Sequence, residues 1–199
     1  NYGAAIQVKG NDLTIINSTF INNAATNNED ISYGGAIYAN ASGLIISNSS
    51  FIGNKVHDYG SHIYLSENTQ NILICNESSF TDGILTGTLQ GSGIYILSDY
   101  NITISNSSFT NNVAVNGGAL DFNAIVSKVE IINNKFVNNH VTGNGGAIAF
   151  ITSTINGLIM ANNTYDSNNA NYGNGGAIYT NAKLNEENST FTGNSAING

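Results

Sequence analysis

The amino-acid sequence predicts an all-β fold, a right-handed parallel β-helix of about seven circuits with three short strands in each. Two phrases alternate along the 199 residues, typified by Gly34-Gly35-Ala36-Ile37 and by Phe51-Ile52-Gly53-Asn54. The aromatic residue of the second phrase returns every 26 to 31 residues, at Phe20, Phe51, Phe80, Phe109, Phe136, Tyr165 and Phe191. This period is typical of stacked repeats, whereas one blade of a β-propeller would need roughly 40 residues or more.

The first expected strand of each circuit lies around residues 35–39, where alternate residues share one face. Glycine before the strand permits a positive φ at the corner. The position of Ile37 is apolar in every copy, so this face is expected to form the core: Ile6, Ile37, Ile63, Ile94, Leu120, Ile148 and Ile178. The position two residues later is apolar until the last copy: Val8, Ala39, Leu65, Ile96, Phe122, Phe150 and Thr180.

The second expected strand carries another apolar column and ends at an asparagine. The apolar column is Leu13, Leu44, Ile72, Ile102, Val129, Leu158 and Leu184. Four residues later stands the first asparagine column: Asn17, Asn48, Asn76, Asn106, Asn133, Asn162 and Asn188. Asparagine tolerates the left-handed backbone conformation, so this column predicts a sharp turn.

The third expected strand begins at the recurring phenylalanine. Three residues after it stands the second asparagine column: Asn23, Asn54, Asn112, Asn139, Asn168 and Asn194, with Gly83 in the remaining copy. A small or aliphatic column follows: Ala25, Val56, Leu85, Ala114, Val141, Ala170 and Ala196. Amides stacked in register can hydrogen-bond to one another and so satisfy buried polar groups along the axis.

The composition argues against several classes of function. The net charge is −8, with five lysines and no arginine, so little is available to neutralise the phosphates of a nucleic acid or an anionic membrane. Cys75 is the only cysteine, so no intrachain disulfide is possible. No apolar run reaches the roughly 18 residues of a membrane span. We expect residues 1–199 to form one domain, a segment of a longer secreted repeat protein.

The paired phrases resemble the polymorphic outer membrane proteins of chlamydiae and the adhesin-like surface proteins of methanogenic archaea. The copies that carry the resemblance are Gly34-Gly35-Ala36-Ile37 with Phe51-Ile52-Gly53-Asn54 and Gly117-Gly118-Ala119-Leu120 with Phe136-Val137-Asn138-Asn139. Gly60-Ser61-His62-Ile63 and Phe80-Thr81-Asp82-Gly83 depart from the pattern. The resemblance implies an extracellular, cell-surface protein used in adhesion, with no cofactor and no catalytic residues. Its implied partner is a glycan or protein of a host or neighbouring cell.

Two other functions are compatible with the predicted fold. Many parallel β-helices are polysaccharide lyases or glycoside hydrolases, which need carboxylates that converge on one groove. Asp121, Glu130 and Asp166 stand alone in uncharged columns, and the best candidate pair is Glu67 with Asp99 in similar loops. The other function is a self-assembling filament unit, because the cut ends of a β-helix present unpaired strand edges.

One column is a candidate ligand-binding strip. Tyr38, Tyr64, Tyr95 and Tyr179 stand beside the inward isoleucines, interrupted by Asp121 and Ala149. Exposed tyrosines can stack on sugars or contact a protein partner. The alternative is that loops cover the rings, or that the rings only stabilise the sheet by stacking.

Three further features have mainly structural interpretations. His57, Asp58 and His62 are close enough in sequence to suggest a metal site. We interpret them instead as a solvated loop with one outward side chain, and Cys75 as a buried or half-buried thiol, so no metal site is predicted. Glycosylation sequons occur at Asn17, Asn40, Asn48, Asn76, Asn101, Asn106, Asn162 and Asn188. Those in the first asparagine column cannot carry glycan if that column points inward.

Overall fold

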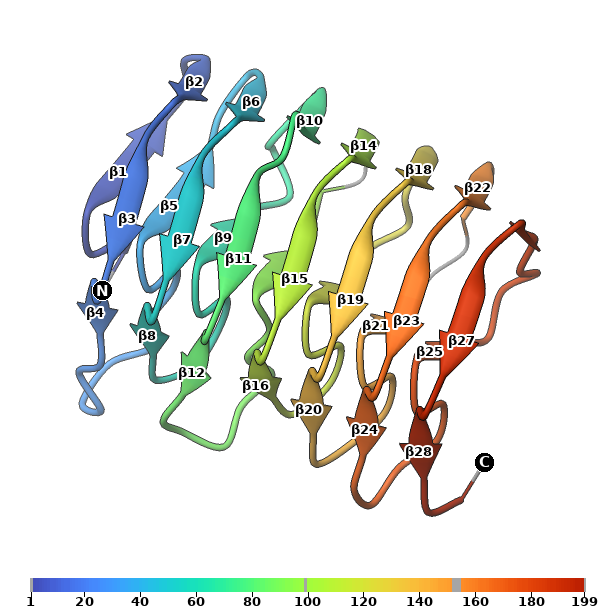
Figure 1. The fold of residues 1–199 in the computed structure, drawn as a ribbon. Coiled ribbons are helices and arrows are strands. Elements are labelled where there is room, and N and C mark those ends of the chain that lie inside the picture. The colour runs from blue at the N-terminus through green and yellow to red at the C-terminus, as the bar shows by residue number, and fades with distance from the viewer. Residues whose placement is uncertain (1, 99, 152–154, 199) are drawn as a thin grey trace.

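The protein is a solenoid of four parallel β-sheets, each with seven strands. The structure is a computed structural model that describes residues 2–98, 100–151 and 155–198. Figure 1 shows the circuits stacked side by side along one axis, with the two termini at opposite ends. All named elements are strands, and among the described residues no helix is suited to crossing a bilayer. The predicted all-β parallel β-helix is therefore confirmed.

The first sheet contains the predicted isoleucine column. Its strands are β1 (Ile6–Lys9), β5 (Ile37–Asn40), β9 (Ile63–Leu65), β13 (Ile94–Ile96), β17 (Leu120–Phe122), β21 (Ile148–Phe150) and β25 (Ile178–Thr180). Ile37 pairs in register with Ile6 on one side and with Ile63 on the other. The same register continues through the sheet, so each column residue lies directly over its equivalent.

The second sheet keeps one register throughout, but its last strand is short. Its strands are β2 (Leu13–Ile16), β6 (Leu44–Ser47), β10 (Ile72–Cys75), β14 (Asn101–Ser105), β18 (Lys128–Ile132), β22 (Leu158–Ala161) and β26 (Glu186–Glu187). Because β26 is only two residues long, Leu184 lies outside the strand, and its side chain is exposed rather than in the expected core column. Glu186 stands opposite the buried Met160 in place of an apolar residue.

The third and fourth sheets follow each other directly in every circuit. The third contains β3 (Thr19–Ile21), β7 (Ser50–Ile52), β11 (Ser79–Thr81), β15 (Ser108–Thr110), β19 (Lys135–Val137), β23 (Thr164–Asp166) and β27 (Thr190–Thr192). The fourth contains β4 (Ala24–Ala25), β8 (Lys55–Val56), β12 (Ile84–Leu85), β16 (Val113–Ala114), β20 (His140–Val141), β24 (Asn169–Ala170) and β28 (Ser195–Ala196). Three strands per circuit were predicted, and the fourth was missed because two residues are too few to show an alternation.

Left-handed residues form the corners on both sides of the third sheet. All seven members of the first asparagine column have φ between 47° and 59°, which confirms the predicted turn. A second row of positive φ follows the third sheet: Asn22, Gly53, Asp82, Asn111, Asn138, Ser167 and Gly193. Asparagine and glycine are favoured there because other side chains pay a steric cost in this conformation.

The core is built on a stack of aromatic rings. Neighbouring rings from Phe20 to Phe191 have centroids 4.6 to 5.1 Å apart and planes within 11° of parallel. This separation matches the roughly 4.8 Å spacing of hydrogen-bonded strands, so strand pairing sets the ring geometry. The isoleucine and leucine columns of the first two sheets pack around the rings.

We predict that glycine is required where two circuits approach most closely. A Cβ atom added at Gly146 would lie 2.0 Å from the Gly176 carbonyl oxygen and 2.6 Å from the Asn169 amide nitrogen. Gly146→Ala should therefore lower the free energy of unfolding by about 1–3 kcal/mol or more, measured by chemical denaturation. Gly157→Ala is the matched control, because its nearest neighbour is the flexible Lys128 side chain at 3.7 Å. Equal stability of the two variants would contradict the predicted close approach.

Candidate functional site

The second asparagine column forms a buried hydrogen-bonded ladder. Asn139 shows the pattern: its backbone N–H and its Nδ2 both donate to Oδ1 of Asn168, at 3.0 and 2.9 Å. The same Nδ2 also donates to the Phe109 carbonyl oxygen at 3.1 Å. The fully buried members are Asn54, Asn112, Asn139 and Asn168. Because each amide offers donors and an acceptor, the column and the phenylalanine carbonyl oxygens beside it satisfy its polar atoms.

The first asparagine column lies on the surface, and the serine or asparagine just before the third sheet is more deeply buried; in the third circuit this is Ser78, because Glu77 intervenes. All seven of its members are exposed at the corner before the third sheet. The following serine or asparagine accepts a backbone N–H from the previous circuit, as Asn134 Oδ1 does from Ser107 at 3.0 Å. The sequons of this column therefore do not point inward. The amides that satisfy buried backbone groups come from the neighbouring position.

His62 takes the place of the asparagine that the ladder lacks at Gly83. Its Nδ1 lies 3.1 Å from Asn54 Nδ2, and its Nε2 lies 2.9 Å from Asn112 Oδ1. The imidazole thus connects the amides of the circuits before and after its own. A Cβ atom at position 83 would stand 2.8 Å from His62 Nε2, so the glycine leaves the space that the ring occupies.

The surroundings of His62 favour its neutral form. Asn54 Oδ1 accepts hydrogen bonds from Asn23, which leaves the Nδ2 donor of Asn54 facing the ring. Nδ1 must then be an acceptor, and Nε2 carries the proton that is donated to Asn112. Burial lowers the pKa of His62 from 6.5 to about 4, although the bond to Asn112 and the charge of Asp82 oppose this shift.

The expected solvated loop at His57, Asp58 and His62 is wrong. His62 and Asp58 are buried, because the ring belongs to the amide ladder and Asp58 Oδ2 accepts the Ser32 amide at 2.8 Å. His57 Nδ1 lies 3.0 Å from Asp58 Oδ1, so the two histidines have different partners. In the part of the chain that the structure describes, no three His, Cys, Asp or Glu side chains are grouped to hold a metal ion. The Cys75 thiol is half-buried, as interpreted.

The predicted tyrosine column exists, but its rings are covered. Tyr38, Tyr64 and Tyr95 stack with centroids 5.4 and 5.7 Å apart, and their side chains are only 7–9% exposed. A second column, Tyr2, Tyr33 and Tyr59, packs over them from the preceding corner; Tyr33 meets Tyr64 at 4.7 Å. The expected exposed strip is therefore wrong for these three residues. Tyr179 is half-buried and is separated from them by Asp121 and Ala149, and ligand binding by the four residues stays a prediction.

The sequence contained a signal for the covering column. Tyr2, Tyr33 and Tyr59 each precede the first glycine of the recurring phrase, at Gly3, Gly34 and Gly60. A position that is aromatic in three successive copies stacks as the inner column does. Burial raises the pKa of Tyr64 and of Tyr95, and the nearby Asp121 raises that of Tyr95 further.

The three acidic residues that stand alone in uncharged columns lie on different sheets. Asp121, Glu130 and Asp166 lie on the first, second and third sheets, so they do not share a face. A hydrogen bond from Lys128, whose Nζ lies 2.8 Å from Glu130 Oε1, holds the pKa of that carboxyl below its usual value. Burial raises the pKa of Asp121 well above its usual value. The expected pair of Glu67 with Asp99 cannot be placed, because Asp99 lies outside the described residues.

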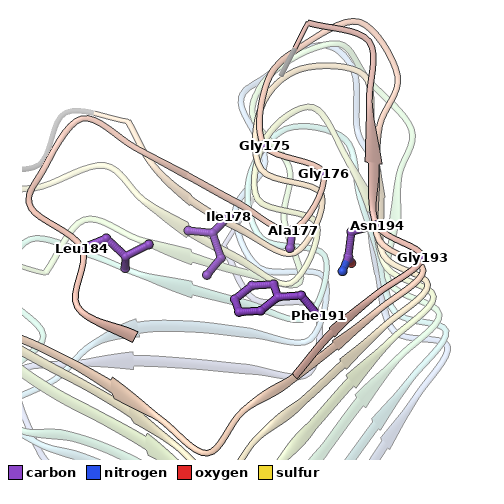
Figure 2. A pocket seen from close by; sticks show the side chains of 8 residues that line it. All are labelled: Gly175, Gly176, Ala177, Ile178, Leu184, Phe191, Gly193 and Asn194. Carbon is purple, nitrogen blue, oxygen red and sulfur yellow. The ribbon is translucent and has the colours of Figure 1, made fainter. Parts of the chain in front are cut away.

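A cavity of about 420 Å³ lies at the end of the core in the last circuit. Figure 2 shows the side chains that line it, with the Phe191 ring between Ile178 and Asn194. Phe191 is 51% exposed here, since β27 pairs with β23 on one side. The lining contains no ionisable side chain, so this cavity has no groups for acid–base chemistry.

Comparisons with known proteins agree with this architecture. A family model described as a right handed beta helix region matches residues 1–136. A second, described as the Chlamydia polymorphic membrane protein repeat, matches residues 135–150, which include the Phe136 phrase and Gly145-Gly146-Ala147-Ile148. No curated protein and no solved structure matches the chain. The two family matches confirm the right-handed coiling and the resemblance to the chlamydial repeats.

We predict that His62 and Gly83 compensate for each other. His62→Ala should lower the free energy of unfolding by about 1–3 kcal/mol, because the amides lose a buried partner. Gly83→Asn should cost about 1–3 kcal/mol by overpacking against the ring. All four proteins carry Ser61→Gly, because Ser61 Oγ would lie 2.2 Å from a Cβ at position 83 and the Gly-Gly-Ala copies have glycine there. The double variant then restores an asparagine beside Gly-Ala, as in those circuits, and should lose less than either single change. Denaturation of all four proteins gives the coupling energy, and additive losses would contradict the substitution of histidine for asparagine.

We also predict an acid-sensitive contribution from His62. Its pKa is about 4 in the folded chain and 6.5 when unfolded, so between these values only the unfolded chain takes up the proton. Stability should therefore fall by about 1.4 kcal/mol per pH unit as the pH falls from 6.5 to 4. The contribution of Asp121 to the pH dependence has the opposite sign, because its raised pKa stabilises the folded chain at low pH and this stability is lost as the pH rises.

The pH prediction is measured as a difference between two proteins. Asp121 is present in both the Ser61→Gly chain and its His62→Ala/Gly83→Asn variant, so its contribution cancels. Denaturation at several pH values should show a steeper acid loss in the chain that keeps His62. Parallel pH profiles would show that His62 is not the titrating group.

Proposed function

The chain belongs to the family of right-handed beta helix regions, and from this premise we propose that it is a rigid structural module of an adhesin-like cell-surface protein. The match to the chlamydial membrane protein repeat supports a surface location, because that family's name places its members in a membrane. Under this proposal the module is extracellular, does not itself span the membrane, and needs no cofactor.

The observation that carries the proposal is the unbroken pairing of equivalent residues along the rod. Each strand pairs in parallel with its equivalents in the neighbouring circuits, in all four sheets. The ring stack and the amide ladder run along the same axis. Bending the rod would strain all four sheets and both buried columns at once. Six steps of about 4.8 Å give a stiff spacer of about 29 Å.

The third sheet is the face that supports contact with a partner. Its outward positions include a row of hydroxyl and other polar side chains: Thr19, Ser50, Ser79, Ser108, Lys135, Thr164 and Thr190. The exposed corner residues lie on both sides of this row, as Asn106 and Asn111 do beside β15. Hydroxyls and amides on a flat face can exchange hydrogen bonds with glycan hydroxyls or with a protein surface. We therefore assign adhesion to this face, with a glycan or protein of a host or neighbouring cell as partner.

A polysaccharide-cleaving enzyme of the same fold is the alternative, and the described carboxylates favour the structural role. Retaining and inverting glycosidases hold two carboxyl groups within about 5–9.5 Å of each other across one sugar. Asp121, Glu130 and Asp166 are on three different sheets. The net charge of −8 without arginine gives no clamp for an acidic polysaccharide.

We predict that distances between labels along the rod have narrow distributions and increase in proportion to the number of circuits between the labels. Thr14 and Ile159 are outward residues of the second sheet, five register steps apart, and Thr103 lies three steps from Thr14. Cys75→Ser removes the native thiol at a position where the preceding circuit has Ser47. Nitroxides at Thr14→Cys with Ile159→Cys, and at Thr14→Cys with Thr103→Cys, should give narrow distance distributions whose centres differ by about 10 Å.

The same preparation separates the proposal from its alternative. Broad distance distributions would contradict a rigid spacer. Release of new reducing ends from cell-surface polysaccharides would support the enzyme instead. Beads coated with the chain should adhere to partner cells, and polysaccharide or glycoprotein extracted from those cells should compete for adhesion. Beads that do not adhere would leave a spacer without adhesive contacts of its own and would contradict that part of the proposal.

A further inference from the structure

The two tyrosine columns leave a small recess where the outer column ends. The recess has a volume of about 180 Å³ and is lined by Ile31, Tyr33, Tyr59, Tyr64, Tyr95 and Leu97. Tyr59 covers Tyr64 and touches Tyr95, but the equivalent position of the next circuit is Gln90. The fourth ring of the outer column is therefore replaced by an amide, and Tyr95 has no ring of its own circuit over it.

The rings around this recess are inclined to one another. Tyr59 and Tyr95 have centroids 4.9 Å apart with planes at 52°, and Tyr33 meets Tyr64 at 64°. Within each column the rings are nearly parallel, as Tyr33 and Tyr59 are at 13°. Because the rings of each column cover one another's faces, the recess offers the face of Tyr59 that a fourth ring would have covered, with Tyr95 inclined beside it. A cation is attracted to such an uncovered π face.

The charge around the recess is also suited to a cation. The carboxylates of Asp58 and Glu67 act electrostatically on Tyr33 and Tyr64, two of the lining residues. At the far end of the outer column the chain places a cation on the same kind of surface: Lys9 Nζ lies 5.2 Å from the Tyr2 ring centroid. The lining side chains are phenols and aliphatic chains, so a ligand that needs many hydrogen bonds would leave most of its polar groups without a partner.

We propose that this recess binds a methylated ammonium group, such as the trimethylammonium group of choline. Such a cation spreads its charge over methyl groups and needs no hydrogen bond, so aromatic walls replace its water at little cost. A sugar would leave hydroxyls unpaired against Ile31 and Leu97, and an anion would be repelled by the nearby carboxylates. The site goes beyond the proposed adhesive face, because it lies on the first sheet and not on the third.

The proposal is tested with the purified chain and a matched pair of small molecules. Choline and its uncharged isostere 3,3-dimethylbutan-1-ol are titrated while tyrosine ring signals are followed by NMR. Choline should saturate with a dissociation constant on the order of 1 mM, and the isostere should bind at least about tenfold more weakly. Equal binding of the two would show that the recess recognises apolar shape and would overturn the proposal, as would tighter binding of methyl glucoside.

Variants at the aromatic walls locate the binding. Tyr59→Ala removes one wall and should weaken choline binding by about tenfold, whereas Tyr59→Phe keeps the ring face and should bind nearly as the wild type does. Tyr172→Ala is the control, because this tyrosine is 74% exposed at another corner. Leu97 packs against the rings, and Leu97→Lys keeps an aliphatic stem there while it brings a competing cation to the rim, so it should abolish choline binding. Choline binding unchanged in both Tyr59→Ala and Leu97→Lys would overturn the assignment.

A last comparison identifies the source of the ammonium group. Sedimentation of the chain with phosphatidylcholine vesicles, abolished by free choline, would identify a lipid head group. Binding of choline without sedimentation would identify a free small molecule. Both outcomes support the proposal, and vesicle binding that choline does not compete for, in a chain that does not bind choline, would overturn it.

Discussion

Strand pairing fixes the distance between equivalent residues, and every other feature of this protein follows from that distance. Parallel strands stack about 4.8 Å apart, so each side chain has its own counterpart as its nearest neighbour along the axis. Only side chains that tolerate a copy of themselves can fill a buried column. Aromatic rings do so by parallel stacking at 4.6–5.1 Å, and aliphatic chains do so by simple packing. The resulting rod has a core that is a set of parallel columns rather than a cluster.

Buried polar columns meet a stricter condition. A stacked amide works because its oxygen accepts what the amide of the neighbouring circuit donates. A column of ionised groups would repel itself, and two buried titratable groups, His62 and Asp121, have pKa values shifted toward their neutral forms. His62 is held neutral between two amides, and the carboxyl of Asp121 is surrounded by buried neighbours. Histidine can replace asparagine because its neutral ring, too, offers both a donor and an acceptor.

The repeating part of the fold could be predicted from the sequence, and the non-repeating part could not. The isoleucine column, the ring stack and the left-handed asparagine corner each recur in seven copies, so the pattern can be recognised within one sequence. The fourth sheet escaped prediction because its strands have two residues. Tyr64 is buried because Tyr33, a residue of the corner before the first sheet, packs over it, and a strand pattern does not predict this contact. In the sequence, two departures from the repeat look independent: Gly60-Ser61-His62-Ile63 and Phe80-Thr81-Asp82-Gly83. The structure shows that they are linked, because the His62 ring fills the space left by Gly83.

The pairing of His62 with Gly83 also affects how such a chain can change by recombination. Duplication or loss of a whole circuit preserves every column, so the gene can lengthen or shorten the rod in units of one repeat. Both residues lie in one circuit, from the corner just before β9 to the start of β12, and a crossover outside residues 62–83 carries them together. A crossover between residues 62 and 83 separates them, and the hybrid then has either a ring pressed against an asparagine or a break in the ladder. Selection should therefore keep these two positions linked in descendants of this repeat array.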